Sequence, residues 1–151
     1  MVSSLRDTMK TAANLIRSKA HQSVHTISPE ASVFDAIQLM ADKNIGALLI
    51  LENDRPVGIM SERDYARKII LEGRSSRDTK IRSIMTTRLV SVSPSDSVEH
   101  AMALMTREHI RHLPVMEGNS VLGLVSIGDL VKAMISQQQF TIEQLERYIA
   151  M

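Results

Sequence analysis

The sequence predicts a mixed α/β (α+β) fold built from two copies of one β-α-β-β-α unit. Residues 28–68 repeat at 93–133 with a constant shift of 65 and no gap, and thirteen of the 41 aligned positions are identical. In each copy a helical apolar stripe precedes two short apolar runs, and a second helical stripe follows them. One unit of about 60 residues buries too little surface to be stable alone. We therefore expect the two copies to share a core and to pack with pseudo-two-fold symmetry.

Each element of the first copy has its own signal. The extended piece HTISP ends in Ser-Pro, and Ser32 with Asp35 fits a capping box at the start of a helix. The apolar runs GALLIL and VGIM are typical of strands, and ENDRP between them has residues that favour a turn. A second helix is expected to begin at Ser61. The second copy gives the same order, with VSVSP, a helix from Ser97, HLPVM, EGNS, VLGLV and a helix from Ser126.

Both ends of the chain also have helical spacing. Leu5, Met9, Ala12, Leu15 and Ile16 form an apolar stripe near the start, and Ile142, Leu145 and Ile149 form one near the end. Thr141 to Gln144 fits a further capping box, which predicts that a separate helix begins there. The expected organisation is an N-terminal helix in 1–23, repeat 1 in 24–72, a polar linker in 73–84, repeat 2 in 85–138 and a C-terminal helix in 139–151.

Composition excludes several classes of protein. The chain has 44% apolar and 23% charged residues and a formal net charge of +1, which gives no general attraction to nucleic acid or anionic membranes. It has no cysteine, so disulfides and cysteine-ligated zinc are excluded. Its apolar runs are far shorter than the roughly 20 residues of a membrane span. The charged N-terminus does not fit a secretory signal, and a cytoplasmic protein is expected.

The stretch Gly58-Ile-Met-Ser61-Glu-Arg-Asp64 returns as Gly123-Leu-Val-Ser126-Ile-Gly-Asp129. One interpretation is helix capping, in which the serine and the aspartate satisfy N–H groups of the first turn. The other is ligand binding, because a helix N-terminus favours phosphate and a carboxylate can accept hydrogen bonds from ribose hydroxyls. Glycine at the first position allows close approach of backbone or ligand. The two interpretations are compatible.

Taken together, the tandem β-α-β-β-α units, Ile-Arg-His-Leu-Pro-Val at 110–115 and the two Gly-x-x-Ser-x-x-Asp stretches resemble the cystathionine-β-synthase (CBS) domain. A tandem pair of these domains is called a Bateman module, and the resemblance covers about residues 24–135. SERDYARKI is similar to small stand-alone bacterial members. The resemblance implies a non-catalytic regulatory module that binds an adenine nucleotide between the repeats, and a homodimer. AMP is the first choice of ligand, with ADP, ATP, NAD and S-adenosylmethionine behind it.

In the family, each site combines the Ser/Asp motif of one repeat with the strand entry of the other. The resemblance therefore implies two nucleotide sites, with Asp64 and Asp129 on ribose. The first has two arginines and a histidine for phosphate. In the second, Gly46 and Ala47 replace Arg111 and His112 and Gly128 replaces Arg63, so both cationic positions are missing. Site 1 is expected to contain Gly58, Ser61, Glu62, Arg63, Asp64, Ser91, Ile110, Arg111, His112 and Pro114. Site 2 is expected to contain Thr26, Ile27, Ile45, Gly46, Ala47, Ser126, Ile127, Gly128 and Asp129.

Other functions are weighed on the same residues. No Walker loop, Gly-x-Ser-x-Gly or His-Glu-x-x-His pattern is present, so neither catalysis nor a metal is expected. Eight basic residues against four acidic ones between 62 and 88 leave nucleic-acid binding as a minor alternative. A further alternative is a homo-oligomeric interaction module with vestigial clefts. The partner protein cannot be named from the sequence. A dimer interface is expected on the helices that follow the two motifs, at Tyr65, Ile69, Ile70, Leu130, Val131, Met134 and Ile135.

Overall fold

The computed structural model describes residues 10–19 and 24–150. The chain divides into two compact units. The repeat-1 unit comprises Val24–Val90, and the repeat-2 unit combines Met1–Ser23 with Ser91–Met151. A segment that precedes repeat 1 in the sequence thus belongs to the unit of repeat 2. How the two repeats pack against each other stays a prediction.

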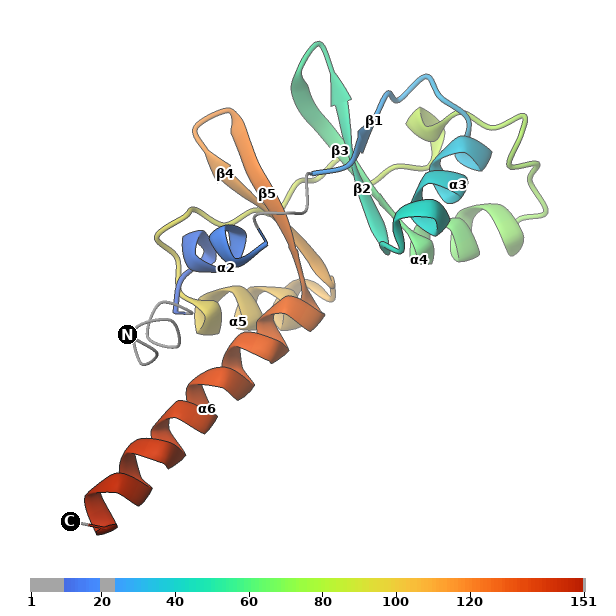
Figure 1. Cartoon of the computed structure of the whole chain (residues 1–151). Coiled ribbons are helices and arrows are strands. Elements are labelled where there is room, and N and C mark those ends of the chain that lie inside the picture. Colours follow the sequence, from blue (N-terminus) through green and yellow to red (C-terminus); the bar gives the residue numbers. More distant parts are fainter. Residues whose placement is uncertain (1–9, 20–23, 151) are drawn as a thin grey trace. The chain divides into compact units, whose positions relative to one another are not determined.

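The repeat-1 unit has the predicted β-α-β-β-α order (Figure 1). Its three-stranded sheet has the order β1-β2-β3, in which β1 and β2 are parallel and β2 and β3 form an antiparallel hairpin. The helix that begins after Ser61 starts as an α-helix and continues as a π-helix. The elements are β1 Thr26–Ile27, α3 Val33–Lys43, β2 Ala47–Glu52, β3 Arg55–Ser61, α4 Glu62–Tyr65 and the π-helix Ala66–Ile70, followed by the 3-10 helix Ile81–Ser83.

The repeat-2 unit has the same plan with a weaker first strand. Its antiparallel hairpin joins β4 and β5, and the expected first strand is present as a single parallel bridge between Val92 and Val115. The elements are α2 Ala12–Ser18, α5 Val98–Glu108, β4 His112–Glu117, β5 Ser120–Ser126 and α6 Ile127–Ala150.

The duplication extends to irregular backbone features. α3 and α5 both end in the left-handed conformation, at Asn44 (φ 54°) and His109 (φ 56°), which are 65 positions apart. The hairpins carry register shifts after Ile50 and after Val115, again 65 apart. Asparagine and histidine are among the residues that tolerate a positive φ best. The two repeats therefore share local conformations that sequence identity does not cover.

The segments 10–19 and 79–88, which are 69 positions apart, make matching hydrogen bonds to the two repeats. Ala12 N–H donates to the Asp96 carbonyl at 2.8 Å, as Ile81 N–H donates to the Ala31 carbonyl at 2.9 Å. The Lys10 carbonyl accepts from Val98 N–H at 2.9 Å, as the Thr79 carbonyl accepts from Val33 N–H at 2.8 Å. Each repeat is thus completed by a segment that precedes it or follows it in the chain. The predicted linker 73–84 is partly core, since Ile81 and Ile84 are buried.

The predicted break before the C-terminal helix is wrong. α6 continues from Ile127 to Ala150, and the Thr141 hydroxyl donates to the Gln137 carbonyl one turn back instead of capping a new helix. Residues 129–150 contain no glycine or proline to end a helix. At the other end, α2 Ala12–Ser18 lies within the predicted N-terminal helix of 1–23, while Leu5 and Met9 lie outside the described residues.

Each unit has its own apolar core between its helices and its sheet. Leu48 and Leu113, at equivalent positions of β2 and β4, are fully buried. The repeat-1 core comprises Val33, Ala36, Met40, Leu48, Ile50, Met60, Ile69, Ile81 and Ile84. The buried apolar residues of the repeat-2 unit are Ala12, Leu15, Val92, Val98, Ala101, Leu104, Met105, Leu113, Val115, Val125, Leu130 and Ala133.

Candidate functional site

The first motif forms the capping box at the start of α4. Asp64 Oδ2 accepts the Ser61 N–H at 2.9 Å and the Ser61 hydroxyl at 3.1 Å, and the Asp64 N–H donates to Ser61 Oγ at 3.2 Å. On the other carboxylate oxygen, Lys68 Nζ lies 3.3 Å from Oδ1 and the Thr86 hydroxyl lies 3.4 Å from it. The capping prediction is confirmed, and it holds the Asp64 carboxylate in one orientation.

The second motif has the same reciprocal bonds at the start of α6. Ser126 N–H donates to Asp129 Oδ2 at 2.8 Å, and Asp129 N–H donates to Ser126 Oγ at 3.2 Å. Lys19 Nζ, at the end of α2, lies 2.8 Å from the same Oδ2 and donates to the Leu124 carbonyl at 3.0 Å. The two aspartates thus have equivalent capping geometry. The lysine that contacts each one comes from a different part of the chain, Lys68 for Asp64 and Lys19 for Asp129.

Each motif lies next to the strand entry of its own repeat. The Glu62 N–H donates to the Gly46 carbonyl at 3.1 Å, and the Ile127 N–H donates to the Arg111 carbonyl at 2.8 Å. In the hairpin registers Ala47 is opposite Ser61, and His112 is opposite Ser126. Repeat 1 therefore combines its motif with small residues, whereas repeat 2 combines its motif with an arginine and a histidine.

Within each repeat the structure brings the motif to Gly46 and Ala47 or to Arg111 and His112. The grouping of the predicted site residues across the repeats stays a prediction. Ala47, Gly58 and Pro114 are buried. Thr26, Glu62, Ser91, Arg111 and Gly128 are exposed. The remaining members are partly buried, namely Ile27, Ile45, Gly46, Ser61, Arg63, Asp64, Ile110, His112, Ser126, Ile127 and Asp129.

Lys19 is the functional candidate that the sequence prediction missed. The second site was expected to have neither of its cationic positions, but the Lys19 ammonium contacts Asp129 across 110 residues of sequence. The only sequence signal that relates the segment of Lys19 to 79–88 is a shared apolar spacing, at positions 12, 15 and 16 and at positions 81, 84 and 85. Because no residue is identical between 10–19 and 79–88, a search for identical pairs cannot find it.

Glycine at the first motif position is required by close packing in both repeats. A Cβ on Gly58 would lie 2.8 Å from Met85 Sδ and 3.0 Å from the Thr86 carbonyl oxygen, and one on Gly123 would lie 2.3 Å from Ile16 Cδ1. These neighbours belong to the two completing segments, 79–88 and 10–19. The glycines are therefore needed for close packing within the chain itself. The sequence pattern had also allowed that they make room for a ligand.

Replacing Lys19 with methionine is expected to lower the free energy of unfolding at neutral pH by about 1 kcal/mol, the net contribution of a typical intramolecular hydrogen bond. Burial raises the pKa of Asp129, but the hydrogen bonds from Lys19 and Ser126 outweigh it, so the pKa lies below its ordinary value. The carboxylate therefore stabilises the fold above the unfolded pKa of about 3.9, and this contribution is lost as pH falls through the folded pKa.

Urea unfolding of wild type and Lys19→Met from pH 7 to pH 3 measures this effect. The difference in unfolding free energy should shrink below about pH 4. Lys43→Met replaces an exposed lysine of α3 and serves as the control without such a difference. A difference that is the same at all pH values would contradict the assignment.

His112 makes stability depend on pH near neutrality. Burial lowers the pKa of its imidazole, with Asp129 opposing the shift and Lys19 and Arg111 adding to it. The folded state therefore binds the proton less well than the unfolded state, and stability falls as pH drops below about 6.5, by at most about 1.4 kcal/mol per pH unit. Unfolding of His112→Gln between pH 7.5 and 5 should lack this component. His100→Gln, at an exposed histidine, should leave this pH dependence unchanged. Equal pH profiles for wild type and His112→Gln would contradict the assignment to His112.

Comparison with known proteins decides the family. A family model described as the CBS domain matches residues 12–71 and 81–136. The chain belongs to the CBS domain family. CBS domains are non-catalytic, and the two matches confirm the tandem pair. A solved CBS-domain structure that is 44% identical, with a TM-score of 0.79 over 83% of this chain and 98% of its own, confirms the mixed α/β class.

Two curated CBS proteins illustrate the range of relatives. The mitochondrial CBSX3 of Arabidopsis thaliana is 43% identical over 78% of this chain, and the chain spans 60% of its length. YhcV of Bacillus subtilis is 34% identical over 91% of this chain and 89% of its own length. The predicted similarity to small bacterial CBS proteins is therefore confirmed.

Solved structures agree with this assignment. A protein with CBS domains from Burkholderia ambifaria MC40-6 is 48% identical, with a TM-score of 0.81 over 87% of this chain and 98% of its own. The hexameric CBS-CP12 protein from bloom-forming cyanobacteria is 32% identical, with a TM-score of 0.68 over 73% of this chain and 62% of its own. The CBS pair of MJ0100 was solved with 5′-methylthioadenosine and S-adenosylmethionine; it is 23% identical, with a TM-score of 0.68 over 75% of this chain and 89% of its own.

The basic stretch of the first CBS domain is engaged with its own fold. Lys68 donates to the Ile84 carbonyl at 2.7 Å, Arg74 contacts Ser83, and Arg77 lies over the Phe34 ring at 3.9 Å. Arg82 pairs with Glu30 and Glu52. Hydrogen bonds from Lys80 and then Arg82 lower the pKa of Glu30, and those to Glu30 and Glu52 raise the pKa of Arg82. These contacts favour a structural role for the basic residues over binding of nucleic acid.

Within residues 10–19 and 24–150, histidines and carboxylates form no group of three or more that could hold a metal ion. His21 lies outside the described residues. None of the described helices combines the length and the apolar character that crossing a membrane requires.

Proposed function

We propose that the chain is a regulatory module that binds an adenine nucleotide, with AMP as the first choice and ADP, ATP, NAD or S-adenosylmethionine as alternatives. The observation that carries the proposal is the pair of equivalent Ser/Asp boxes, each placing a largely buried carboxylate at a helix start. The complex of MJ0100 with two adenosyl compounds supports the class of ligand. Within this proposal, a cytoplasmic location also stays a prediction.

The proposed first site joins Ser61, Arg63 and Asp64 with Arg111 and His112 of the other repeat, as predicted from the family. The second site joins Asp129 with Gly46 and Ala47. Lys19 lies on Asp129 where a ribose would bind, so a ligand there has to share the carboxylate with the ammonium or displace it. Lys68 also contacts Asp64, but at a longer distance of 3.3 Å against 2.8 Å for Lys19 and Asp129. The weaker competition favours the first site as the tighter one. The signal then comes from different ligand affinities for two arrangements of the repeats.

Thermal unfolding of protein stripped of carried-over ligand tests the proposal. A ligand at 100 times its dissociation constant adds about 2.7 kcal/mol to stability. One of the five ligands is expected to raise the midpoint strongly. No shift with any of them would contradict the proposal.

A second candidate is a homo-oligomeric interaction module with vestigial clefts. The exposed apolar side chains on the outer part of α6 favour it, with Ile142, Leu145 and Ile149 between 47% and 81% exposed. Part of the predicted dimer face is excluded, because Ile69 and Leu130 are buried in their own units. Self-association without any ligand-dependent shift would favour this second candidate.

A further inference from the structure

α6 is longer than the part of it that packs against its own unit. The helix has 24 residues, but its fully buried side chains are Leu130 and Ala133, both in the first two turns. The rest of the helix runs past the other elements of the repeat-2 unit (Figure 1). Most helical stability in proteins comes from packing of an apolar face. The outer half of α6 therefore needs a second packing surface.

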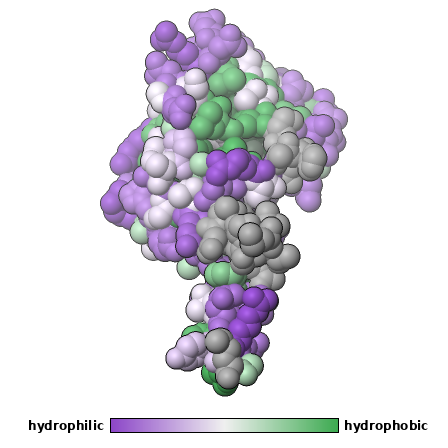
Figure 2. Space-filling view, turned by 60° about the vertical axis from the view of Figure 1, so that its left-hand side comes forward, coloured by the Kyte–Doolittle hydropathy of each residue, from purple (hydrophilic) through white to green (hydrophobic). Residues whose placement is uncertain are grey.

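An apolar stripe with heptad spacing follows the exposed side of α6. Positions 135, 142 and 149 are seven apart, and 131, 138 and 145 lie between them. Gln138 is the polar member. At roughly 100° per residue the stripe lies about a third of a turn from Leu130 and Ala133, so both faces can be covered at once. Figure 2 shows apolar side chains at the outer end of α6. We call this stripe the α6 seam: Val131 (42% exposed), Ile135 (59%), Gln138, Ile142 (47%), Leu145 (58%) and Ile149 (81%).

We propose that the α6 seam packs antiparallel against the α6 seam of a second copy of this chain, around a two-fold axis near residue 140. In this register Ile135 meets Leu145 of the second copy, and Val131 meets Ile149. The proposal is independent of nucleotide binding.

The charges beside the seam favour this orientation. One flank carries Lys132, Gln139 and Glu146, all exposed and seven residues apart. In the antiparallel pair this flank meets itself, so Lys132 lies against Glu146 of the second copy and Gln139 lies against its own equivalent. A parallel pair would place the flank against Met134, Thr141 and Tyr148, which carry no charge. Charges beside a coiled-coil seam set partner orientation.

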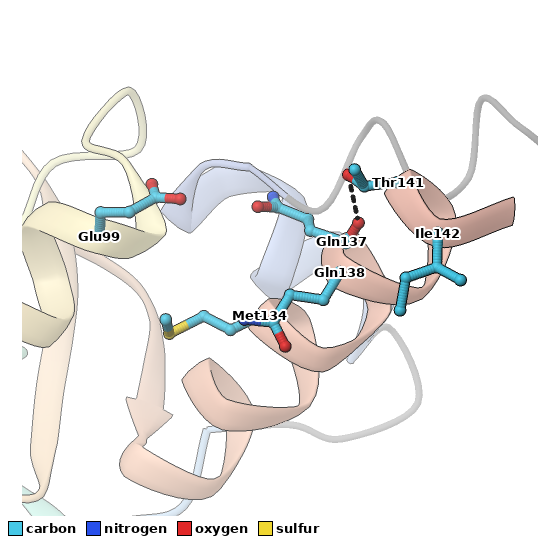
Figure 3. A pocket seen from close by; sticks show the side chains of 6 residues that line it. All are labelled: Glu99, Met134, Gln137, Gln138, Thr141 and Ile142. Carbon is cyan, nitrogen blue, oxygen red and sulfur yellow. Dashed lines mark hydrogen bonds between the residues drawn. The ribbon is translucent and has the colours of Figure 1, made fainter. Parts of the chain in front are cut away.

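A hollow beside the seam fits the same register. It is lined by Glu99 of α5 and by Met134, Gln137, Gln138, Thr141 and Ile142 of α6, and its volume is about 440 Å³ (Figure 3). Two-fold pairing brings Tyr148 of the second copy beside Met134. The Tyr148 side chain is 76% exposed in the single chain. Its ring would fill the hollow and contact the methionine sulfur, a favourable pairing.

A charge exchange tests the pairing. In sedimentation equilibrium the full chain is expected to dimerise. Lys132→Glu and Glu146→Lys, which each place like charges together, should weaken the dimer about tenfold. The double exchange should restore it. Arg147→Glu changes a charge on the opposite side of the helix and should leave the dimer unchanged. A monomeric wild type, or a dimer that neither single exchange weakens, would overturn the proposal.

Single cysteines test the orientation, because the chain has none of its own. When Ile135→Cys and Leu145→Cys proteins are mixed and oxidised, the antiparallel pair should cross-link one variant to the other. Cross-linking of each variant only to itself would indicate a parallel pair and overturn the proposal. A monomer in which hydrogen exchange shows a protected seam would instead indicate that another part of the same chain covers it, which also overturns the proposal.

Discussion

Replacing Asp64 with alanine is expected to abolish the stabilisation by a bound adenine nucleotide, about 2.7 kcal/mol at 100 times the dissociation constant. The carboxylate is held by Ser61 in the orientation that the capping box imposes, with the side chain 14% exposed. Without it, the ribose hydroxyls lose their acceptor. The measurement is the ligand-induced shift in unfolding, compared within each variant.

A control separates ligand binding from capping. Asp64→Ala also breaks the capping box, which costs about 0.5–2 kcal/mol in the absence of ligand. Ser32→Ala removes the cap of α3, where Ser32 Oγ accepts the Asp35 N–H at 3.0 Å, and should keep the full ligand response. Asp129→Ala should also keep the response of the first site. Loss in Asp129→Ala and not in Asp64→Ala would mean that the ligand uses the second site.

Leu48→Ala and Leu113→Ala are each expected to lower the free energy of unfolding by about 2–5 kcal/mol. The two leucines occupy equivalent positions of the repeats, and both are fully buried. Each substitution leaves a cavity that the surrounding core fills only in part. Urea unfolding measures the loss.

Leu71→Ala is the matched control, since Leu71 is 79% exposed and its truncation should change stability by less than about 0.5 kcal/mol. A loss below 1 kcal/mol at either buried leucine would contradict the core described above. A large loss at only one of them would show that the two repeats differ in packing more than their sequences do.

Local features of the fold could be predicted from the sequence. The capping boxes at Ser61 and Ser126 were predicted from residues three apart, and they depend on bonds within one helical turn. The hairpins follow from two apolar runs with turn residues between them. Asn53 and Asp54 have φ values of 52° and 62°, which suits the residue types that turns favour.

Long-range features could not be predicted in this way. The pairing of Lys19 with Asp129 depends on how α2 packs against the repeat-2 unit, which no local pattern contains. Ile81 and Ile84 lie in a stretch that looked polar, and their burial follows from contacts with repeat 1. At Thr141 a local signal was misleading, because continuing the helix keeps its backbone hydrogen bonds.

Hydrogen exchange with and without AMP tests most directly whether a ligand joins the two repeats. Slower exchange is expected in one titration both at the amides of residues 61–64 in the first repeat and at those of residues 110–113 in the second. Protection should saturate at the same AMP concentration in both stretches and be absent in Asp64→Ala. Protection of one stretch alone, or of neither, would contradict a ligand bound by both repeats.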